Sequence, residues 1–229
     1  MNVAIIAAAG QGTRMAGNRP KQFLQLAGAP IICHTLKPFE QCDSIQEIIV
    51  VLPAEESAGF LSHADQYGLK KLARVVPGGT TRAESVWRGL LAIGAATAEI
   101  VAVHDGVRPF VTVDEIDRTV AAAQANGAAI LVAPAVDTIK QVNEGAVVKT
   151  LKRRELRHAL TPQCFRYGLL RRAYESADLN DPALTDDSSL VEQLGESVTI
   201  VEGSSRNIKI TSQQDLLIAE TFLKEGFWS

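Results

Sequence analysis

The sequence predicts an α/β fold in which helices flank a mostly parallel sheet. Short apolar runs alternate with longer amphipathic stretches along the chain, and this alternation is typical of strands joined by right-handed helical crossovers. The first apolar run, residues 3–6, leads into a glycine-rich loop, as it does in Rossmann-like sheets. A length of 229 residues suits one such unit, so we expect residues 1–229 to form a single domain.

The regular alternation covers the chain up to residue 132. Runs rich in Val, Ile and Ala predict strands at 3–6, 48–52, 73–76, 100–103 and 129–132. Helices are expected between them, at about 31–42, 53–68, 81–93 and 113–126. Pro30 suits the first position of the first helix, and Val86, Leu90, Leu91 and Ile93 form the apolar stripe of the third.

Residues 137–157 interrupt this rhythm. Residues 138–142 and 146–151 alternate apolar and polar side chains around Asn143-Glu144-Gly145, which predicts a two-stranded hairpin. A hairpin standing alone is only marginally stable in water, so this one needs a partner surface. We expect a protruding arm that pairs with a second copy of the chain; a hairpin folded onto its own domain is the alternative.

The C-terminal part returns to the α/β pattern. Helices are expected at 167–177, in a short segment ending near Leu194, and after Thr211 or Ser212, either of which could cap the last helix with Asp215 in its first turn. Two further strands are expected at 198–201 and 208–210.

Composition excludes several classes of protein. A net charge of −3 argues against a nucleic-acid groove, so any anion site must be a local cluster of cations. No apolar run approaches the length of a membrane span, and the N-terminus does not read as a basic signal sequence. The three cysteines are far apart and lack CxxC spacing, which suits buried thiols in a reducing cytoplasm.

The loop after the first strand has the composition of a phosphate site. Its glycines allow backbone amides to turn toward an anion, and its cations add full positive charges; the residues concerned are Ala8, Ala9, Gly10, Gly12, Arg14 and Lys21. A Walker A loop is excluded because no Gly-Lys-Ser/Thr ends the motif. A dinucleotide fingerprint is disfavoured because Met15 stands where a third glycine is needed, which argues against an NAD-dependent dehydrogenase. A plain Gly-rich turn with surface cations nearby remains the alternative.

Two later loops also follow predicted strands. The motif Gly78-Gly79-Thr80-Thr81-Arg82-Ala83-Glu84-Ser85 would let a planar base approach the backbone, although its hydroxyls could also serve only as helix caps. Asp105 could supply a hard oxygen ligand for Mg²⁺. Adjacent His104 would point the other way from Asp105, and no nucleophile elbow is present, so a hydrolytic triad is disfavoured. Because ligands bind at the carboxyl ends of parallel strands, we expect all three loops to meet in one site.

Ala-Ala-Gly-x-Gly-x-Arg-Met followed by Pro20-Lys21-Gln22 resembles the signature loop of nucleotidyltransferases that activate polyol phosphates. The chain is most similar to the 2-C-methyl-D-erythritol 4-phosphate cytidylyltransferase family of the non-mevalonate isoprenoid pathway, and the match recurs along nearly its whole length. This resemblance implies that CTP and 2-C-methyl-D-erythritol 4-phosphate give CDP-methylerythritol and pyrophosphate, with Mg²⁺ as cofactor and a homodimer formed through the arm.

The same resemblance implies roles for individual residues. Arg14 and Lys21 would be catalytic, and Gly78, Gly79, Arg82 and Ser85 would read the base. The polyol phosphate would be bound by Thr138, Arg153, Thr185 and Lys209, with Arg108 as a neighbour and Asp105 as metal ligand. Arg153 is the match for an arginine that reaches the neighbouring subunit's substrate, Arg154 being the second choice; whether it acts in cis or in trans is left open.

Departures from the family pattern are few. Gly106-Val107 replaces two small residues, usually alanines, and Arg157 replaces an expected aromatic residue near the arm. Two rival functions remain open besides the disfavoured dehydrogenase. One is a cytidylyltransferase for another polyol phosphate, ribitol 5-phosphate especially, and the other is a non-catalytic nucleotide-binding regulator.

Overall fold

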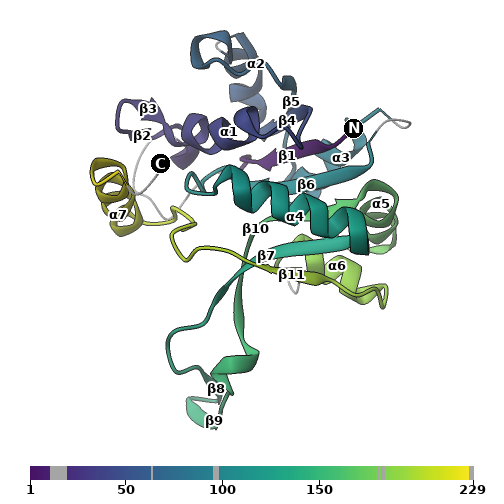
Figure 1. The fold of residues 1–229 in the computed structure, drawn as a ribbon, viewed down its shortest axis with the longest axis vertical. Coiled ribbons are helices and arrows are strands. Elements are labelled where there is room, and N and C mark those ends of the chain that lie inside the picture. The colour runs from purple at the N-terminus through teal and green to yellow at the C-terminus, as the bar shows by residue number, and fades with distance from the viewer. Residues whose placement is uncertain (11–19, 63, 95–97, 180, 182–183, 227–229) are drawn as a thin grey trace.

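A computed structural model describes residues 1–10, 20–62, 64–94, 98–179, 181 and 184–226. Within these residues the chain forms one central sheet with helices on both faces, and a hairpin arm extends away from it (Figure 1). The predicted α/β fold with a mostly parallel sheet is therefore confirmed.

The central sheet has seven strands among the described residues, in the order β11-β7-β10-β6-β1-β4-β5. Their bounds are β1 Val3–Ala7, β4 Glu47–Leu52, β5 Leu72–Pro77, β6 Ile100–Asp105, β7 Ala128–Pro134, β10 Arg157–Arg166 and β11 Thr199–Glu202. Strand β10 lies between β6 and β7 and is antiparallel to both, whereas the other pairings are parallel. The carboxyl ends of β1, β4, β5 and β6 therefore lie at the same edge.

Alternate residues of the buried strands serve the two faces of the sheet. In β1, Ala4 and Ile6 pack with one helical layer, and Val3 and Ile5 pack with the other. The first layer is formed by α1 Ile31–Gln41 and α4 Val113–Asn126, and the second by α3 Arg82–Leu91, α5 Tyr167–Ser176 and α6 Asp187–Gln193. Burial on both faces explains why these strands are continuous apolar runs.

The remaining elements lie around the sheet. Helix α2 Ala54–Ser62 and the 3-10 turn η2 Ala64–Tyr67 follow β4, and α7 Gln213–Lys224 packs on a small separate cluster that includes Ile31 and Phe110. The short elements are η1 Lys21–Phe23, β2 Gln25–Leu26, β3 Ala29–Pro30 and η3 Arg153–Glu155.

Side-chain caps fix the starts of two helices that were predicted from the sequence. The hydroxyl of Thr112 accepts from the amide of Glu115, and the carboxylate of Glu115 accepts from the amide of Thr112. Helix α4 has the predicted bounds 113–126. Ser212 and Asp215 form the same capping box at α7, so Ser212 is the cap of the two candidates.

Two local expectations were wrong. Residues 208–210 form no strand: the amide of Ile210 donates to the carbonyl of Val107 at 2.9 Å, and this contact is not continued into a ladder. Leu91 does not belong to the buried stripe of α3, since 57% of it is exposed at the last turn of the helix.

The arm consists of β8 Lys140–Asn143 and β9 Ala146–Thr150, which pair antiparallel. Glu144 and Gly145 both adopt positive φ, 48° and 81°, as the tight turns of twisted hairpins require. Every residue of both strands is exposed, including Val142 and Val147. The protruding hairpin is therefore observed as predicted (Figure 1), and its pairing with a second chain stays a prediction.

Two general expectations can be compared with the fold. All three cysteines are free and buried, as expected for thiols in a reducing compartment. Among the helices that the structure describes, none has both the length and the apolar character that crossing a membrane demands.

Candidate active site

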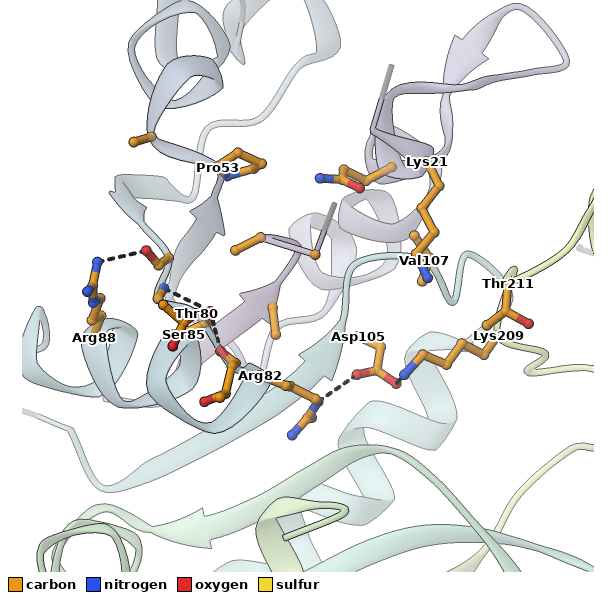
Figure 2. Close-up of a pocket in the computed structure, with 18 of the residues that line it drawn as sticks. Lys21, Pro53, Thr80, Arg82, Ser85, Arg88, Asp105, Val107, Lys209 and Thr211 are labelled. Atoms are coloured by element: carbon orange, nitrogen blue, oxygen red, sulfur yellow. Dashed lines mark hydrogen bonds and ion pairs between the residues drawn. The ribbon is translucent and has the colours of Figure 1, made fainter. Parts of the chain in front are cut away.

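A cleft of about 790 Å³ opens where the carboxyl ends of β1, β4, β5 and β6 meet. Its walls combine backbone-rich glycine loops with several cationic side chains (Figure 2). The sequence-predicted residues that line it are Ala9, Gly10, Lys21, Gly78, Gly79, Arg82, Ser85, Asp105 and Lys209. The three loops singled out in the sequence thus do meet at one edge of the sheet.

The loop after β1 is held at its start by two hydrogen bonds. The amide of Ala8 donates to the carbonyl of Val51 at 2.9 Å, and buried Gln22 donates from Nε2 to the carbonyl of Ala8 at 2.6 Å. The second bond ties the loop to the 3-10 turn that carries Lys21, so this lysine is placed at the wall of the cleft. Gly12 and Arg14 lie outside the described residues.

Both glycines of the loop after β5 have close neighbours, and Gly78 has no room for a side chain. A Cβ on Gly78 would lie 2.1 Å from the Cβ of Ala9, and a Cβ on Gly79 would lie 2.2 Å from the side chain of Glu84. The hydroxyl of Ser85 accepts from the Gly79 amide at 3.0 Å and donates to the carbonyl of Thr81 at 2.8 Å. Ser85 therefore holds the loop in place from the first turn of α3.

Asp105, at the end of β6, contacts three cations. Its Oδ1 accepts from Arg82 Nε at 3.0 Å, and its Oδ2 lies 3.1 Å from both Arg108 Nε and Lys209 Nζ. Burial alone raises the pKa of this carboxyl, but the attraction of the three cations outweighs it and holds the pKa well below its usual value. Asp105 is therefore ionised and orients all three cations, two of which line the cleft (Figure 2).

Arg82 has a second buried carboxylate as partner. Its Nη2 lies 2.8 Å from Oδ2 of Asp187, which is 1% exposed at the start of α6. Oδ1 of Asp187 accepts from the hydroxyl of Tyr174 at 2.5 Å. Burial disfavours the charge of Arg82, yet Asp187 and Asp105 together raise its pKa well above the ordinary value. Arg82 therefore stays charged in a fixed orientation.

His104 is buried and serves as a structural link. Its Nε2 donates to the carbonyl of Arg108 at 3.0 Å, and its Nδ1 lies 2.9 Å from the hydroxyl of Thr161, which also accepts from the amide of Asp105 at 3.2 Å. Burial lowers the pKa of His104 to about 4, so the ring is neutral near neutral pH. Both ring nitrogens are engaged inside the protein, with Arg108 and Thr161, so the contacts of His104 are those of a structural link.

The donor set offers little to a metal ion on its own. Among the described residues, no three His, Cys, Asp or Glu side chains form a group that could hold one. Asp105 is a single carboxylate whose two oxygens already face cations. These residues fit a divalent ion only if phosphate oxygens supply most of its ligands, which is the usual arrangement for Mg²⁺ bound with a nucleotide.

Five predicted site residues lie outside the lining of the cleft. Ala8 precedes the lining residues Ala9 and Gly10, and Arg108 lies behind Asp105, where its Nη1 donates to the carbonyl of Asn207 at 2.8 Å. The other three, Thr138, Arg153 and Thr185, are exposed. Arg153 lines a second cavity, of about 580 Å³, at the base of the arm.

Sequence reasoning missed several lining residues: Ala7, Gln22, Pro53, Ala54, Glu55, Thr80, Thr81, Arg88, Val107 and Thr211. For Arg88 a signal was present, because it follows Glu84 by four residues on a predicted helix. For Gln22 the signal was its place in the motif Pro20-Lys21-Gln22, which was used only for Lys21. The departure at residue 106 is explained by the structure, since a Cβ on Gly106 would lie 2.5 Å from the Cβ of Ala8.

A family model described as 2-C-methyl-D-erythritol 4-phosphate cytidylyltransferase matches residues 2–225. The chain belongs to this family. The relative from Geobacter metallireducens is 44% identical over 225 residues, covering 97% of each chain, and the relative from Geotalea uraniireducens is 45% identical over 223 residues, covering 96% of each. Both are named 2-C-methyl-D-erythritol 4-phosphate cytidylyltransferase.

Solved structures of the cytidylyltransferase family agree with the fold. The 4-diphosphocytidyl-2C-methyl-D-erythritol synthase of Anaerococcus prevotii has a TM-score of 0.86 at 33% identity, covering 97% of this chain and 96% of its own. The 2-C-methyl-D-erythritol 4-phosphate cytidylyltransferase of Thermus thermophilus has a TM-score of 0.77 at 35% identity, covering 97% and 98%. The resemblance inferred from the motifs is therefore confirmed at the level of the family.

Proposed function

We propose that this chain transfers the cytidylyl group of CTP to 2-C-methyl-D-erythritol 4-phosphate, with release of pyrophosphate. Membership of the family supports the reaction. The observation that carries the proposal is the cleft itself, in which glycine loops that admit a planar base lie beside Lys21, Arg82 and Lys209. A base and several phosphate groups need that combination of backbone and positive charge.

The chemistry proposed for this cleft is an in-line displacement. A phosphate oxygen of the polyol phosphate attacks the α-phosphorus of CTP, the new P–O bond forms, and the bond to the β-phosphate oxygen breaks as pyrophosphate leaves. A phosphate monoester is largely dianionic near neutral pH, because its second pKa is about 6. No general base is needed, which agrees with a neutral His104 whose two nitrogens are engaged.

The nucleotide would lie between the loops after β1 and β5. We assign the triphosphate to Lys21 and to Arg14, with amides of residues 8–12 as further donors, and the base to the loop of Gly78 and Gly79. Both glycines line the cleft, and without side chains they leave their backbone open to a ligand. Ser85 and Arg82 would hold this loop and the adjoining wall, as their present contacts do.

The polyol phosphate would bind at the other end of the cleft. Lys209 lines it and is oriented by Asp105, with Arg108 beside that carboxylate and Thr185 as a further binding position. Thr138 and Arg153 lie just before and just after the two strands of the arm, outside the cleft of their own chain. We therefore assign them to the site of a partner subunit in a homodimer, and the exposed valines of the arm support such an interface.

Mg²⁺ is the divalent cation that we propose for the reaction. Phosphate oxygens of CTP would supply most of its ligands, with Asp105 as the protein's candidate, and the bound ion would neutralise charge on the triphosphate. The location that we propose is the cytoplasm, in line with three free, buried thiols.

Pyrophosphate release tests the function directly. Each of CTP, ATP, GTP and UTP is combined with 2-C-methyl-D-erythritol 4-phosphate or ribitol 5-phosphate in the presence of Mg²⁺. We expect release only with CTP and the methylerythritol phosphate. Release with CTP and ribitol 5-phosphate would keep the chemistry and change the substrate, and silence with every pair would mean that the cleft binds nucleotides without turning them over.

A further inference from the structure

Three side chains of α3 bind the backbone of the loop formed by residues 78–80. Arg88 donates from Nη1 to the carbonyl of Gly78 at 2.7 Å, and Ser85 accepts from the amide of Gly79 at 3.0 Å. Glu84 accepts from the amide of Thr80 at 2.7 Å and from its hydroxyl at 2.8 Å. Each residue of the loop is thus bound by a different side chain of the helix that follows it.

Glu84 and Arg88 also bind each other. Arg88 Nη2 lies 2.6 Å from Glu84 Oε1, one helical turn away. The side chain of Glu84 covers Gly79 closely enough that a Cβ at that position would lie 2.2 Å from it. The ion pair therefore spans the loop, because the Glu84 carboxylate accepts from the amide of Thr80 and the Arg88 guanidinium donates to the carbonyl of Gly78.

We propose that Glu84 and Arg88 act as one clamp that fixes the backbone of residues 78–80, and that this clamp sets the affinity for the nucleotide base and the preference for cytosine. The proposal rests on the proposed function, because it assigns the loop to the base. Neither residue needs to touch CTP: both are positioning residues that act through the loop.

The physical reason is the geometry of base recognition by a backbone. The amides of Gly79 and Thr80 already donate to Ser85 and Glu84, so the loop presents carbonyls to a base. A carbonyl selects the amino group of a base only if it points in a fixed direction, since hydrogen bonds weaken steeply with misalignment. Gly78 and Gly79 have many accessible conformations when nothing holds them. The clamp removes this freedom before the nucleotide arrives, so less ordering entropy opposes binding.

The experiment compares Arg88→Met, Glu84→Gln and the double variant with a matched control. In α4, Arg118 pairs with Asp114 at 2.8 Å, also four residues apart, and donates to the carbonyl of Glu202 at 2.9 Å. Arg118→Met removes the same kind of contact outside the lining of the cleft. Steady-state kinetics would give KM for CTP, KM for UTP and KM for the polyol phosphate, and thermal melting would report on the fold.

We expect both clamp variants to raise KM for CTP by roughly tenfold and to reduce the preference for CTP over UTP. Arg88→Met removes a charge-assisted hydrogen bond to Gly78, and Glu84→Gln removes the charge that strengthens the bonds to Thr80 and Arg88. KM for the polyol phosphate should stay at the wild-type value, and Arg118→Met should leave all three constants unchanged. KM for CTP of the double variant should be no higher than that of either single variant, because the two residues act as a unit.

Other outcomes would overturn the clamp. If Arg88 binds the triphosphate itself, Glu84→Gln frees its guanidinium and leaves KM for CTP unchanged or lower, whereas Arg88→Met raises it. Equal increases in both substrates' KM values with a lower melting temperature would indicate general loss of structure.

If the wild-type protein releases no pyrophosphate with any substrate pair, the proposed function fails, and CTP and UTP binding to the same variants is measured by calorimetry. Weaker CTP binding in both clamp variants would then support the clamp, and unchanged binding, or none by the wild type, would refute it.

Discussion

The Nε of Arg82 donates to Oδ1 of Asp105 at 3.0 Å and so joins the start of α3 to the end of β6. The same guanidinium pairs with Asp187 at the start of α6, 2.8 Å away. One cation therefore connects three segments that are far apart in the sequence, and it does so at the wall of the cleft. Arg82 is held by the carboxylates of Asp105 and Asp187, so the shape of this wall of the candidate site depends on both residues.

Asp187→Asn tests this arrangement. The substitution removes one of two charges that orient Arg82, so we expect the free energy of unfolding to fall by roughly 1–3 kcal/mol and KM for CTP to rise. Tyr174→Phe is the matched control, because it removes only the hydroxyl on the far oxygen of Asp187. It should lower stability by about 1 kcal/mol without changing KM. Equal effects of both variants on KM would mean that Arg82 needs no orientation by Asp187.

Asp105→Asn separates two roles of that carboxylate. If it mainly orients Arg82, Arg108 and Lys209, the variant lowers kcat/KM for both substrates while the Mg²⁺ concentration at half-maximal rate stays the same. We expect this result, because the carboxylate already faces three cations. A large increase in the Mg²⁺ requirement would instead identify Asp105 as a metal ligand. The measurement is a Mg²⁺ titration at saturating CTP for both proteins.

His104 predicts a specific pH dependence of stability. Its folded pKa of about 4 lies below the model-peptide value of 6.5, so the folded protein binds fewer protons than the unfolded chain between these values. The neutral ring therefore contributes to the free energy of unfolding in full above pH 6.5, and this contribution is lost as the pH falls toward 4. We expect the wild type to lose roughly 2 kcal/mol from this group between pH 7 and pH 5.

Urea unfolding of the wild type and His104→Gln at pH 7 and pH 5 measures this contribution. The variant should be less stable at pH 7 and show a smaller loss toward pH 5. It should also keep its turnover near neutral pH, because the ring is not needed as a base. A parallel loss of stability in both proteins would assign the pH dependence to other groups.

The elements that local patterns dictate were predictable from the sequence. Helix α4 begins after a capping box and is capped at its C-terminal end by Gly127, with φ of 94°. Both signals lie in the residues that flank the helix. The meeting of the three loops was also predictable, since it follows from the parallel direction of the strands that precede them.

Long-range arrangements were not predictable in this way. Strand β10 enters between β6 and β7 in the opposite direction, and nothing in residues 157–166 encodes which strands they will pair with. The pairing of Arg82 with Asp187 likewise joins residues more than a hundred positions apart. Residues 208–210 have the composition of a strand but pass beside Val107 with one backbone bond, so local propensity was overruled by the tertiary context.

Lys21→Ala tests the proposed triphosphate contact. A cation placed against charge that develops in the transition state accounts for roughly 100- to 1,000-fold in rate, so kcat should fall by about that factor. The melting temperature should hardly change, because Lys21 lies at the wall of the cleft and not in the core. Lys224→Ala, on the exposed last turn of α7, is the control. Near-normal turnover of Lys21→Ala would refute the assignment.

Arg153 can be assigned to its own site or to a partner's by mixing two inactive proteins. Arg153→Ala and Lys21→Ala are each expected to be nearly inactive, for lack of the polyol phosphate contact and of the triphosphate contact. If each site takes Lys21 from its own subunit and Arg153 from the partner, a mixed dimer has one site with both substitutions and one site with neither. Co-expression of the two variants with different affinity tags would let the mixed dimers be purified.

Trans action predicts that the mixed dimer regains about half of the wild-type activity per dimer, because one of its two sites is intact. Cis action predicts none, since each subunit would carry a lesion in its own site. The structure favours the first result: Arg153 donates to the carbonyl of Val136 at 2.7 Å and lines the cavity at the base of the arm, outside its own chain's cleft. A mixed dimer without activity would place Arg153 in its own subunit's site and would require the arm to fold back onto the domain.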